Sequence, residues 1–384
     1  MRILIVCPCP LDPELGAAQV HLNLAAALRA RGHDVVVWAL PAMPPGINWV
    51  QTVRRMRGSL QEFLGGERPF DVVDCAPVLV ASRRHRDARA QWVARSTQPD
   101  SPYLWETVRG SFGVSPRALL RTATDVAWWA MWSALAYRGM SDANRIVCHG
   151  SIEKEWIGAT FPRLRSKVRT YDAALSDKDR TALALVRRAR VAGPARRALR
   201  YLWIGRWVDH KGIGALTAFL SARLVQSENE RFTVAGCGAV GERALTRLGS
   251  HGRIHVVPSY TRSELPGLLA AHDAGLFTSR VEGWGLVLNE MVESGLPVYA
   301  TRAGGIDELR SVLGSFVPAF PPPIDATLPA MPTEETFARY GARFCWDAVV
   351  DRYLEALDPI MPKEGEREAE EKRSKPARDD ASRV

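Results

Sequence analysis

The chain has 384 residues, 46% of them apolar, which excludes a disordered protein and allows two ordinary globular domains. Residues 1–200 carry 30 Lys and Arg against 17 Asp and Glu, whereas residues 201–384 carry 21 against 25, within a total formal charge of +9. The basic first half indicates either an anionic partner, such as acidic lipid headgroups or a phosphorylated acceptor, or an arginine-rich surface without one. Because no signature of a nucleic-acid-binding module is present, nucleic acid is not expected.

The six cysteines form no CxxC pair and no Cys/His cluster with zinc spacing, so we predict free thiols in a reducing cytoplasm and no metal site. The apolar start of the chain is too short for the core of a signal peptide. The longest apolar run, residues 126–137 with Trp128, Trp129 and Trp132, is shorter than the roughly 20 residues of a bilayer span. We therefore expect a cytoplasmic protein, with contact at the inner membrane face as a further hypothesis.

Residues 1–173 read as an α/β domain in which short buried strands alternate with helices. The strands show little alternation of apolar and polar residues, which is typical of parallel strands covered on both faces. The first helix ends at Gly32, a residue that favours helix termination. Strands are predicted at residues 3–7, 34–40, 71–74, 91–95 and 145–148, with the first helix over residues 21–28.

Residues 174–199 are polar and basic and are predicted to connect this domain to a second one. They include Asp177-Lys178-Asp179, a pattern that can hold a metal ion, but no predicted strand precedes it and we expect a solvated loop. A second α/β series follows at 200–332. Its predicted strands are 200–205, 231–235, 253–257, 274–278 and 297–300, and its predicted helices are 212–226, 240–249, 262–271 and 285–294.

A helix predicted at residues 333–357, within a segment 333–360 that crosses between the domains, precedes a charged tail, 361–384, that we expect to be disordered. The sequence thus predicts two doubly wound, Rossmann-like domains. Ligands of such sheets bind beyond the carboxyl ends of the strands, so two facing edges would form a deep cleft.

The segment Ser279–Glu290 carries the most chemistry. A predicted strand ends just before it, and a helix is predicted to begin near Gly285. Free backbone N–H groups at such a helix start suit a phosphate, and Gly283 and Gly285 allow close approach of the backbone. Glu282 and Glu290 flank the turn, where carboxylates are suited to accept hydrogen bonds from sugar and ribose hydroxyls.

These residues resemble family 4 of the GT-B glycosyltransferases, the glycogen-synthase-like and mannosyltransferase-like retaining enzymes. Glu282 and Glu290 match the E-x7-E motif of that family within E-G-W-G-x-x-x-x-E, and residues 205–212 resemble its G-R-x-x-x-x-K-G segment. The resemblance extends over residues 294–298 and 301–308, and it includes Gly16 and the closing segment around Trp346.

The resemblance implies a GT-B fold and transfer of a hexosyl group from a nucleotide sugar to a glycan or lipid-linked acceptor, without a metal or other cofactor. Fixed cations, rather than a metal, would neutralise the leaving diphosphate. Arg206, Lys211 and Glu282 inherit catalytic roles. The nucleotide-sugar-binding roles fall on Gly16, Gly283, Trp284, Gly285, Leu286 and Glu290.

Three positions depart from the family pattern. Thr97 and Gln98 stand where many relatives carry a His, residues 171–174 replace an Asn-Gly pair, and Ala17 follows Gly16 where Gly-Gly is common. Two rivals therefore stay open: a catalytically silent GT-B scaffold or regulatory protein, and another enzyme on the same fold, such as a nucleotide-sugar epimerase or a phosphorylase. Residues 236–241 also match G-x-G-x-x-G, but the next predicted strand is not followed by the acid of a dinucleotide site.

Overall fold

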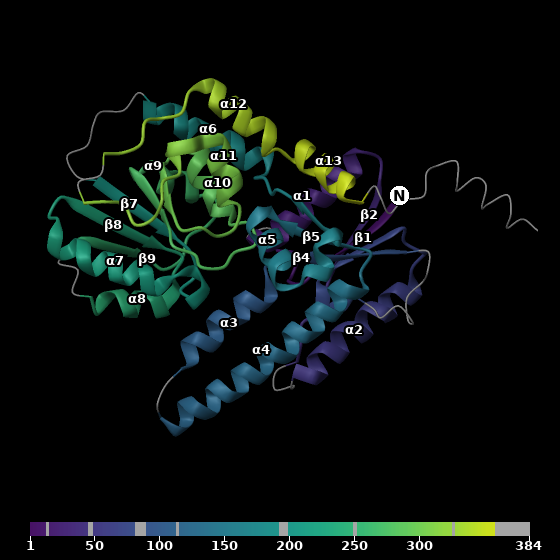
Figure 1. Cartoon of the computed structure of the whole chain (residues 1–384). Coiled ribbons are helices and arrows are strands. Elements are labelled where there is room, and N and C mark those ends of the chain that lie inside the picture. The colour runs from purple at the N-terminus through teal and green to yellow at the C-terminus, as the bar shows by residue number, and fades with distance from the viewer. Residues whose placement is uncertain are drawn as a thin grey trace, which may run out of the picture.

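The computed structural model describes residues 1–12, 15–44, 49–80, 90–112, 115–191, 199–248, 252–324 and 327–357. Within these residues the protein has two lobes, each built on a parallel sheet flanked by helices (Figure 1). This arrangement confirms the predicted α/β class with two parallel sheets.

The sheet of the first lobe has six strands in the order β2-β1-β3-β4-β5-β6, all parallel. Its first strand is apolar and buried from Ile3 to Cys7, as a strand covered on both faces requires. The last strand was not predicted, because its short sequence Val-Arg-Thr-Tyr carries no strong apolar pattern. The strands are β1 (Arg2–Cys7), β2 (Asp34–Ala39), β3 (Val72–Cys75), β4 (Gln91–Ser96), β5 (Arg145–His149) and β6 (Val168–Tyr171).

The helices of this lobe include a long antiparallel pair, α3 and α4, that projects from the body of the lobe (Figure 1). Helix α4 begins where Ser115 Oγ accepts a hydrogen bond from the backbone N–H of Ala118, with Pro116 in the first turn. None of the described helices combines the length and apolarity of a membrane span. The helices are α1 (Gly16–Ala30), α2 (Trp49–Gly66), η1 (Pro77–Leu79), α3 (Asp100–Ser111), α4 (Pro116–Asp142), α5 (Gly150–Thr160) and η2 (Pro162–Lys167).

The connection between the lobes contains a helix, α6 (Asp177–Val191), so the prediction that Asp177-Lys178-Asp179 forms a solvated loop was wrong. The backbone N–H of Asp179 donates to Ser176 Oγ at 3.1 Å, and acidic residues are favourable in the first turn of a helix. The basic pair at residues 196–197 lies outside the described residues.

The sheet of the second lobe has five parallel strands in the order β11-β10-β7-β8-β9, and it reproduces the predicted second series. The strands are β7 (Leu199–Ile204), β8 (Glu230–Ala235), β9 (Ile254–Val257), β10 (Ala274–Phe277) and β11 (Val298–Ala300). The helices are η3 (Asp209–Lys211), α7 (Ile213–Gln226), α8 (Gly238–Thr246), α9 (Leu265–Ala270), α10 (Leu286–Glu293), α11 (Ile306–Leu313) and η4 (Gly314–Phe316).

The C-terminal segment forms two helices, α12 (Glu334–Arg343) and α13 (Trp346–Leu357), where one was predicted. The break follows from packing: the buried Phe344 side chain ends α12 against the second lobe, and α13 then returns to the first lobe. Helix α12 contacts α11, whereas α13 contacts α1 and β6. The predicted tail, 361–384, lies outside the described residues.

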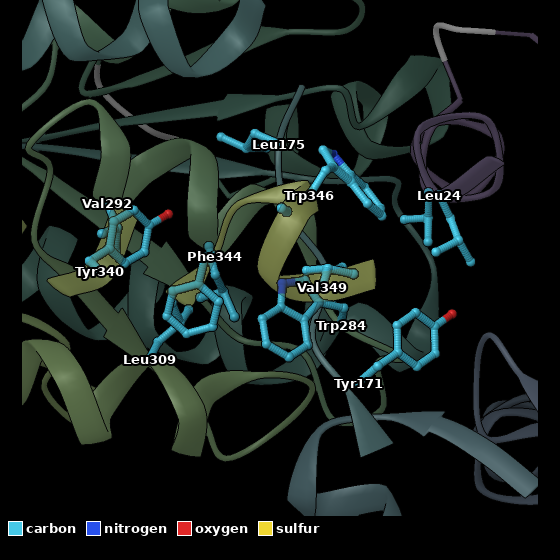
Figure 2. Packing of buried hydrophobic residues seen from close by; sticks show 14 of the residues in the cluster. Leu24, Tyr171, Leu175, Trp284, Val292, Leu309, Tyr340, Phe344, Trp346 and Val349 are labelled. Carbon is cyan, nitrogen blue, oxygen red and sulfur yellow. The ribbon is translucent and has the colours of Figure 1, made fainter. Parts of the chain in front are cut away.

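The two lobes share one apolar core around α13. The rings of Trp284 and Phe344, from the second lobe and the end of α12, lie 5.8 Å apart, and Val349 of α13 packs in the same cluster (Figure 2). A buried polar contact reinforces this junction, since the Tyr353 hydroxyl donates to Asp74, which also binds the Arg95 guanidinium. The crossing helix therefore holds the lobes together through both apolar and polar contacts.

Candidate active site

Two loops of the second lobe meet at the carboxyl edge of its sheet. One follows β7 and contains Arg206 and Lys211, and the other follows β10 and runs from Thr278 to Gly285. Strands β7 and β10 are hydrogen-bonded neighbours, so their loops emerge side by side. The adjacency of these two strands brings together the two motifs that the sequence places about 70 residues apart.

The loops are locked to each other at Gly212. This residue has φ +71°, and a Cβ atom on it would lie 1.8 Å from the carbonyl oxygen of Thr278. The Thr278 hydroxyl donates to the carbonyl oxygen of Lys211 at 2.8 Å and accepts from Trp203 Nε1 at 2.9 Å. Only glycine fits this position without moving the Thr278 backbone.

The predicted catalytic residues Lys211 and Glu282 form an ion pair at the point where the two loops meet. Their side chains are 17% and 10% exposed, and Ser279 Oγ donates to the same Glu282 oxygen at 3.0 Å. Arg206 lies on the preceding turn with an exposed side chain, which forms no ion pair with the described residues. The site therefore offers two cations, one paired and one open to solvent.

The glycine turn touches the first lobe. A Cβ atom on Gly283 would lie 1.9 Å from the carbonyl oxygen of Thr97, and one on Gly16 would lie 3.7 Å from Leu286 Cδ1. Gly285 has φ +84° and precedes α10, and the backbone N–H groups in the first turn of a helix lack partners within the helix. The predicted residues Gly16, Gly283, Gly285 and Leu286 thus lie together where the lobes face each other.

Trp284 lies in the same turn, but its side chain points into the protein core. It is 3% exposed, and its Nε1 donates to Asn289 Oδ1 at 2.6 Å. Only the backbone of Trp284 can therefore face a ligand, and its ring has a packing role.

Glu290 lies in the second turn of α10, is 4% exposed and forms an ion pair with Arg262. Arg262 was not predicted from the sequence, although its place after β9, at the same sheet edge, was a usable signal. Tyr260, two residues earlier, lies beside Gly236, where a Cβ atom would come within 3.2 Å of Tyr260 Cε1. The glycine turn after β8 and the loop after β9 form the side of the site next to Glu290.

Helix α3 of the first lobe covers the other side of the site. The Tyr103 ring lies 4.4 Å from the ring of His210, and Glu106 pairs with Arg280 of the glycine-turn loop at 3.2 Å. Burial lowers the pKa of His210 to about 4, despite the opposing charge of Glu282, so this ring is neutral at pH 7. These contacts were missed because no motif marks α3.

A histidine also lies near the turn, on a strand other than the one considered from sequence. His149 ends β5, the neighbour of β4, and its ring is 6.4 Å from that of Trp284. Burial, together with the charge of Arg95, lowers the pKa of His149 to about 3, so it is a neutral imidazole. The sequence His149-Gly150-Ser151 after a buried strand was the available signal.

Solved structures of glycosyltransferases share this architecture. The chain aligns with HepE (Alr3699) of Anabaena, in complex with UDP and glucose, at 16% identity and a TM-score of 0.59, covering 94% of this chain and 100% of that one. Sucrose-phosphate synthase of Thermosynechococcus elongatus aligns at 16% identity and a TM-score of 0.57, covering 97% and 98%. The catalytic domain of starch synthase IV of Arabidopsis thaliana, bound to ADP and acarbose, aligns at 13% identity and a TM-score of 0.55, covering 97% and 98%. At these identities the likeness establishes the GT-B fold.

Sequence comparison identifies the second lobe more specifically. Residues 198–320 match the family model described as glycosyl transferases group 1, and no curated protein matches the chain. The matched segment contains both site loops with Arg206, Lys211, Glu282 and Glu290. The predicted GT-B fold is confirmed, and the match of residues 198–320 agrees with the predicted recognition of a GT-B glycosyltransferase and with the predicted class of enzyme, whereas family 4 stays a prediction.

Proposed function

We propose that the protein is a retaining glycosyltransferase that moves a hexosyl group from a nucleotide sugar to a glycan or lipid-linked acceptor. The observation that carries this proposal is the convergence of Lys211, Glu282 and the start of α10 at one sheet edge. The match of residues 198–320 to glycosyl transferases group 1 supports it, as do the UDP and ADP bound by the structurally similar HepE and starch synthase IV.

In this proposal the second lobe binds the donor. Arg206 and Lys211 contact the diphosphate, the N–H groups near residues 283–286 contact phosphate and sugar, and Glu282 accepts from sugar hydroxyls. Because Lys211 and Glu282 hold each other in place, a nucleotide sugar that binds beside the pair would meet the ammonium group as a hydrogen-bond donor and the carboxylate as an acceptor, both at fixed positions.

The reaction breaks the bond between the anomeric carbon and the diphosphate oxygen and forms a bond from that carbon to the acceptor oxygen. The acceptor attacks the face of the sugar from which the diphosphate leaves, so the configuration of the anomeric carbon is retained. The acceptor proton passes to the leaving phosphate on that face. Charge grows on the diphosphate as its bond breaks, and the two cations and the helix start stabilise it there. We propose that these fixed charges serve in place of a metal ion.

The test is turnover of UDP-, ADP-, GDP- and dTDP-sugars by the purified protein, with and without lipid and oligosaccharide acceptors. A transferase releases nucleoside diphosphate in an acceptor-dependent reaction that survives EDTA, and the anomeric proton coupling of the product reports retention. Isomerisation of the donor without acceptor would identify an epimerase. Absence of turnover by the folded protein would favour the silent scaffold.

A second proposal concerns the α3–α4 pair. Its projecting end exposes Phe112, Leu119 and Leu120 at 60%, 59% and 70%, an unusual concentration of large apolar side chains. Arg117 and Arg121 are exposed in the same first turns of α4. Apolar side chains beside cations suit the interface of an anionic bilayer, so we propose that this end contacts the inner membrane surface.

A further inference from the structure

A chain of two ion pairs connects Glu290 to the helix between the lobes. One Arg262 nitrogen, Nη1, donates to Glu290 Oε1, and the other, Nη2, donates to Asp179 Oδ2 at 3.0 Å. The three side chains are 5%, 21% and 26% exposed, in the order Glu290, Arg262 and Asp179. They come from α10, from the loop after β9 and from the first turn of α6.

Asp179, at the far end of these two ion pairs, is itself held in place. The Ser176 hydroxyl donates to Asp179 Oδ2 at 2.8 Å and accepts from the Asp179 N–H at 3.1 Å. Asp179 lies in the first turn of α6, and this helix packs against both α9 and α10, which border the site. The geometry of Arg262 is therefore determined from outside the site.

The pairing also accounts for the burial of Glu290. A carboxylate that is nearly inaccessible to water is costly unless a cation contacts it. Burial alone would lower the pKa of the Arg262 guanidinium, but the charges of Glu290 and Asp179 outweigh that effect and raise it. Arg262 is thus a permanent charge beside Glu290.

One oxygen of Glu290 is left for a ligand. Arg262 occupies Oε1, whereas no donor within the described part of the chain contacts Oε2. Tyr260 lies on the same side, and burial followed by the charge of Glu290 raises the pKa of its hydroxyl. Gly236, with φ +75°, packs closely against the Tyr260 ring, since a Cβ atom there would lie 3.2 Å from Tyr260 Cε1. An aromatic ring next to an oriented carboxylate oxygen suits a nucleoside.

We propose that Arg262 is a positioning residue of the nucleotide site: it holds Glu290 by one oxygen so that the other accepts hydrogen bonds from the ribose hydroxyls. Through Asp179 it also links ribose binding to α6. This inference rests on the proposed donor site, and it names the residue that makes that site specific for a ribonucleotide.

The test compares binding of nucleoside diphosphates with that of their 2′,3′-dideoxy analogues by calorimetry, using UDP, ADP and GDP pairs. Hydrogen bonds to a charged group contribute about 1.5–3 kcal/mol, so the parent should prefer the ribonucleotide by roughly 10- to 100-fold. Arg262→Gln should lose most of this preference by binding the ribonucleotide more weakly, with little change for the dideoxy analogue. Arg262→Lys should restore part of it, and Asp179→Asn should show a smaller loss.

Arg231→Gln is the matched control, because Arg231 is an exposed arginine of the same lobe on β8, where it contacts the carbonyl oxygens of Glu228 and Glu230. It should leave the preference unchanged. Equal weakening of both analogues by Arg262→Gln would mean that Arg262 contacts phosphate or base directly, which would overturn the proposal. An unchanged preference would overturn it as well, and an unchanged preference in Asp179→Asn would remove the link to α6. A parent that binds no nucleotide would instead contradict the proposed function on which the inference rests.

Discussion

Lys211 and Glu282 neutralise each other in an ion pair, and this pairing determines what each of them can do for a nucleotide-sugar donor. A Lys ammonium that is 17% exposed and held by a carboxylate is kept in place before the diphosphate arrives. Little rearrangement is then needed when charge develops on the leaving group, and such preorganisation is a large part of electrostatic catalysis.

Replacing Lys211 by Ala should lower kcat/KM by about 100-fold or more, because it removes a fixed cation and leaves Glu282 unpaired near the diphosphate. Donor turnover under single-turnover conditions measures this loss. Lys178→Ala is the control, since Lys178 is an exposed lysine in the first turn of α6. Equal rates in Lys211→Ala and the parent would remove Lys211 from the catalytic group.

Gly212→Ala should destabilise the protein by about 2–4 kcal/mol, because the new methyl group would overlap the Thr278 carbonyl at a residue with φ +71°. Gly214→Ala is the matched control: it lies in α7 with no atom near the added Cβ, and helix propensity predicts a gain of about 0.5–1 kcal/mol. Urea unfolding of both variants measures the two effects. A stable Gly212→Ala variant would show that the two loops are not locked at this point.

The site residues that could be predicted from the sequence are those that belong to a recognised motif or that follow neighbouring strands of the sheet. Lys211 and Glu282 were predicted on that basis. Arg262, Tyr103 and Glu106 were not, because no recognised motif contains them and only tertiary packing shows which residues they contact. Trp284 was assigned to ligand binding by its motif, but the motif cannot distinguish a ring that faces the cleft from one that packs inward.

At the scale of the elements, most strands and helices of the second lobe matched their predicted places, since each alternates buried runs with Gly-containing turns. The C-terminal helix did not. Its apolar pattern continues through the break, and only the return of α13 to the first lobe separates it from α12. The first-turn position of Asp177 and Asp179 likewise depends on Ser176, whose capping role is visible only in the folded chain.

The projecting α3–α4 pair should bind vesicles of phosphatidylglycerol at low salt and phosphatidylcholine vesicles far more weakly, because its exposed end combines apolar and cationic side chains. Replacing Leu119 and Leu120 by Ser should reduce binding by about 10-fold or more, as two apolar side chains no longer enter the interface. Val225→Ser, at an apolar residue of α7 that is 87% exposed, is the control. Sedimentation with vesicles measures the bound fraction, and equal binding by the Leu119/Leu120 variant and the parent would refute this contact.

At the scale of the whole molecule, two buried histidines make stability depend on pH. Burial, with Arg95 nearby, lowers the pKa of His149 to about 3 and that of His21 to about 4. In the unfolded chain each would take up a proton near pH 6.5. The stabilisation from holding them neutral is thus fully present above about pH 6.5 and is lost as the pH falls toward their folded pKa values.

His149→Asn should therefore flatten the acid side of the stability curve by about 1.4 kcal/mol per pH unit between pH 6 and 4, whatever its effect at neutral pH. His255→Asn, at an exposed residue of β9, is the control. Denaturant unfolding at a series of pH values gives the slopes. An unchanged slope in His149→Asn would mean that His149 takes up its proton equally in the folded and unfolded states.

In the proposed function the donor binds to the second lobe, at the two loops that contain Lys211 and Glu282. The measurement that tests this most directly is calorimetric titration of the folded protein, and of Lys211→Ala, with UDP, ADP, GDP and dTDP. We expect one or more of these nucleotides to bind the parent with a stoichiometry of about one, and to bind Lys211→Ala at least about 10-fold more weakly. Failure of all four to bind the folded parent, or equal affinity for both proteins, would contradict it.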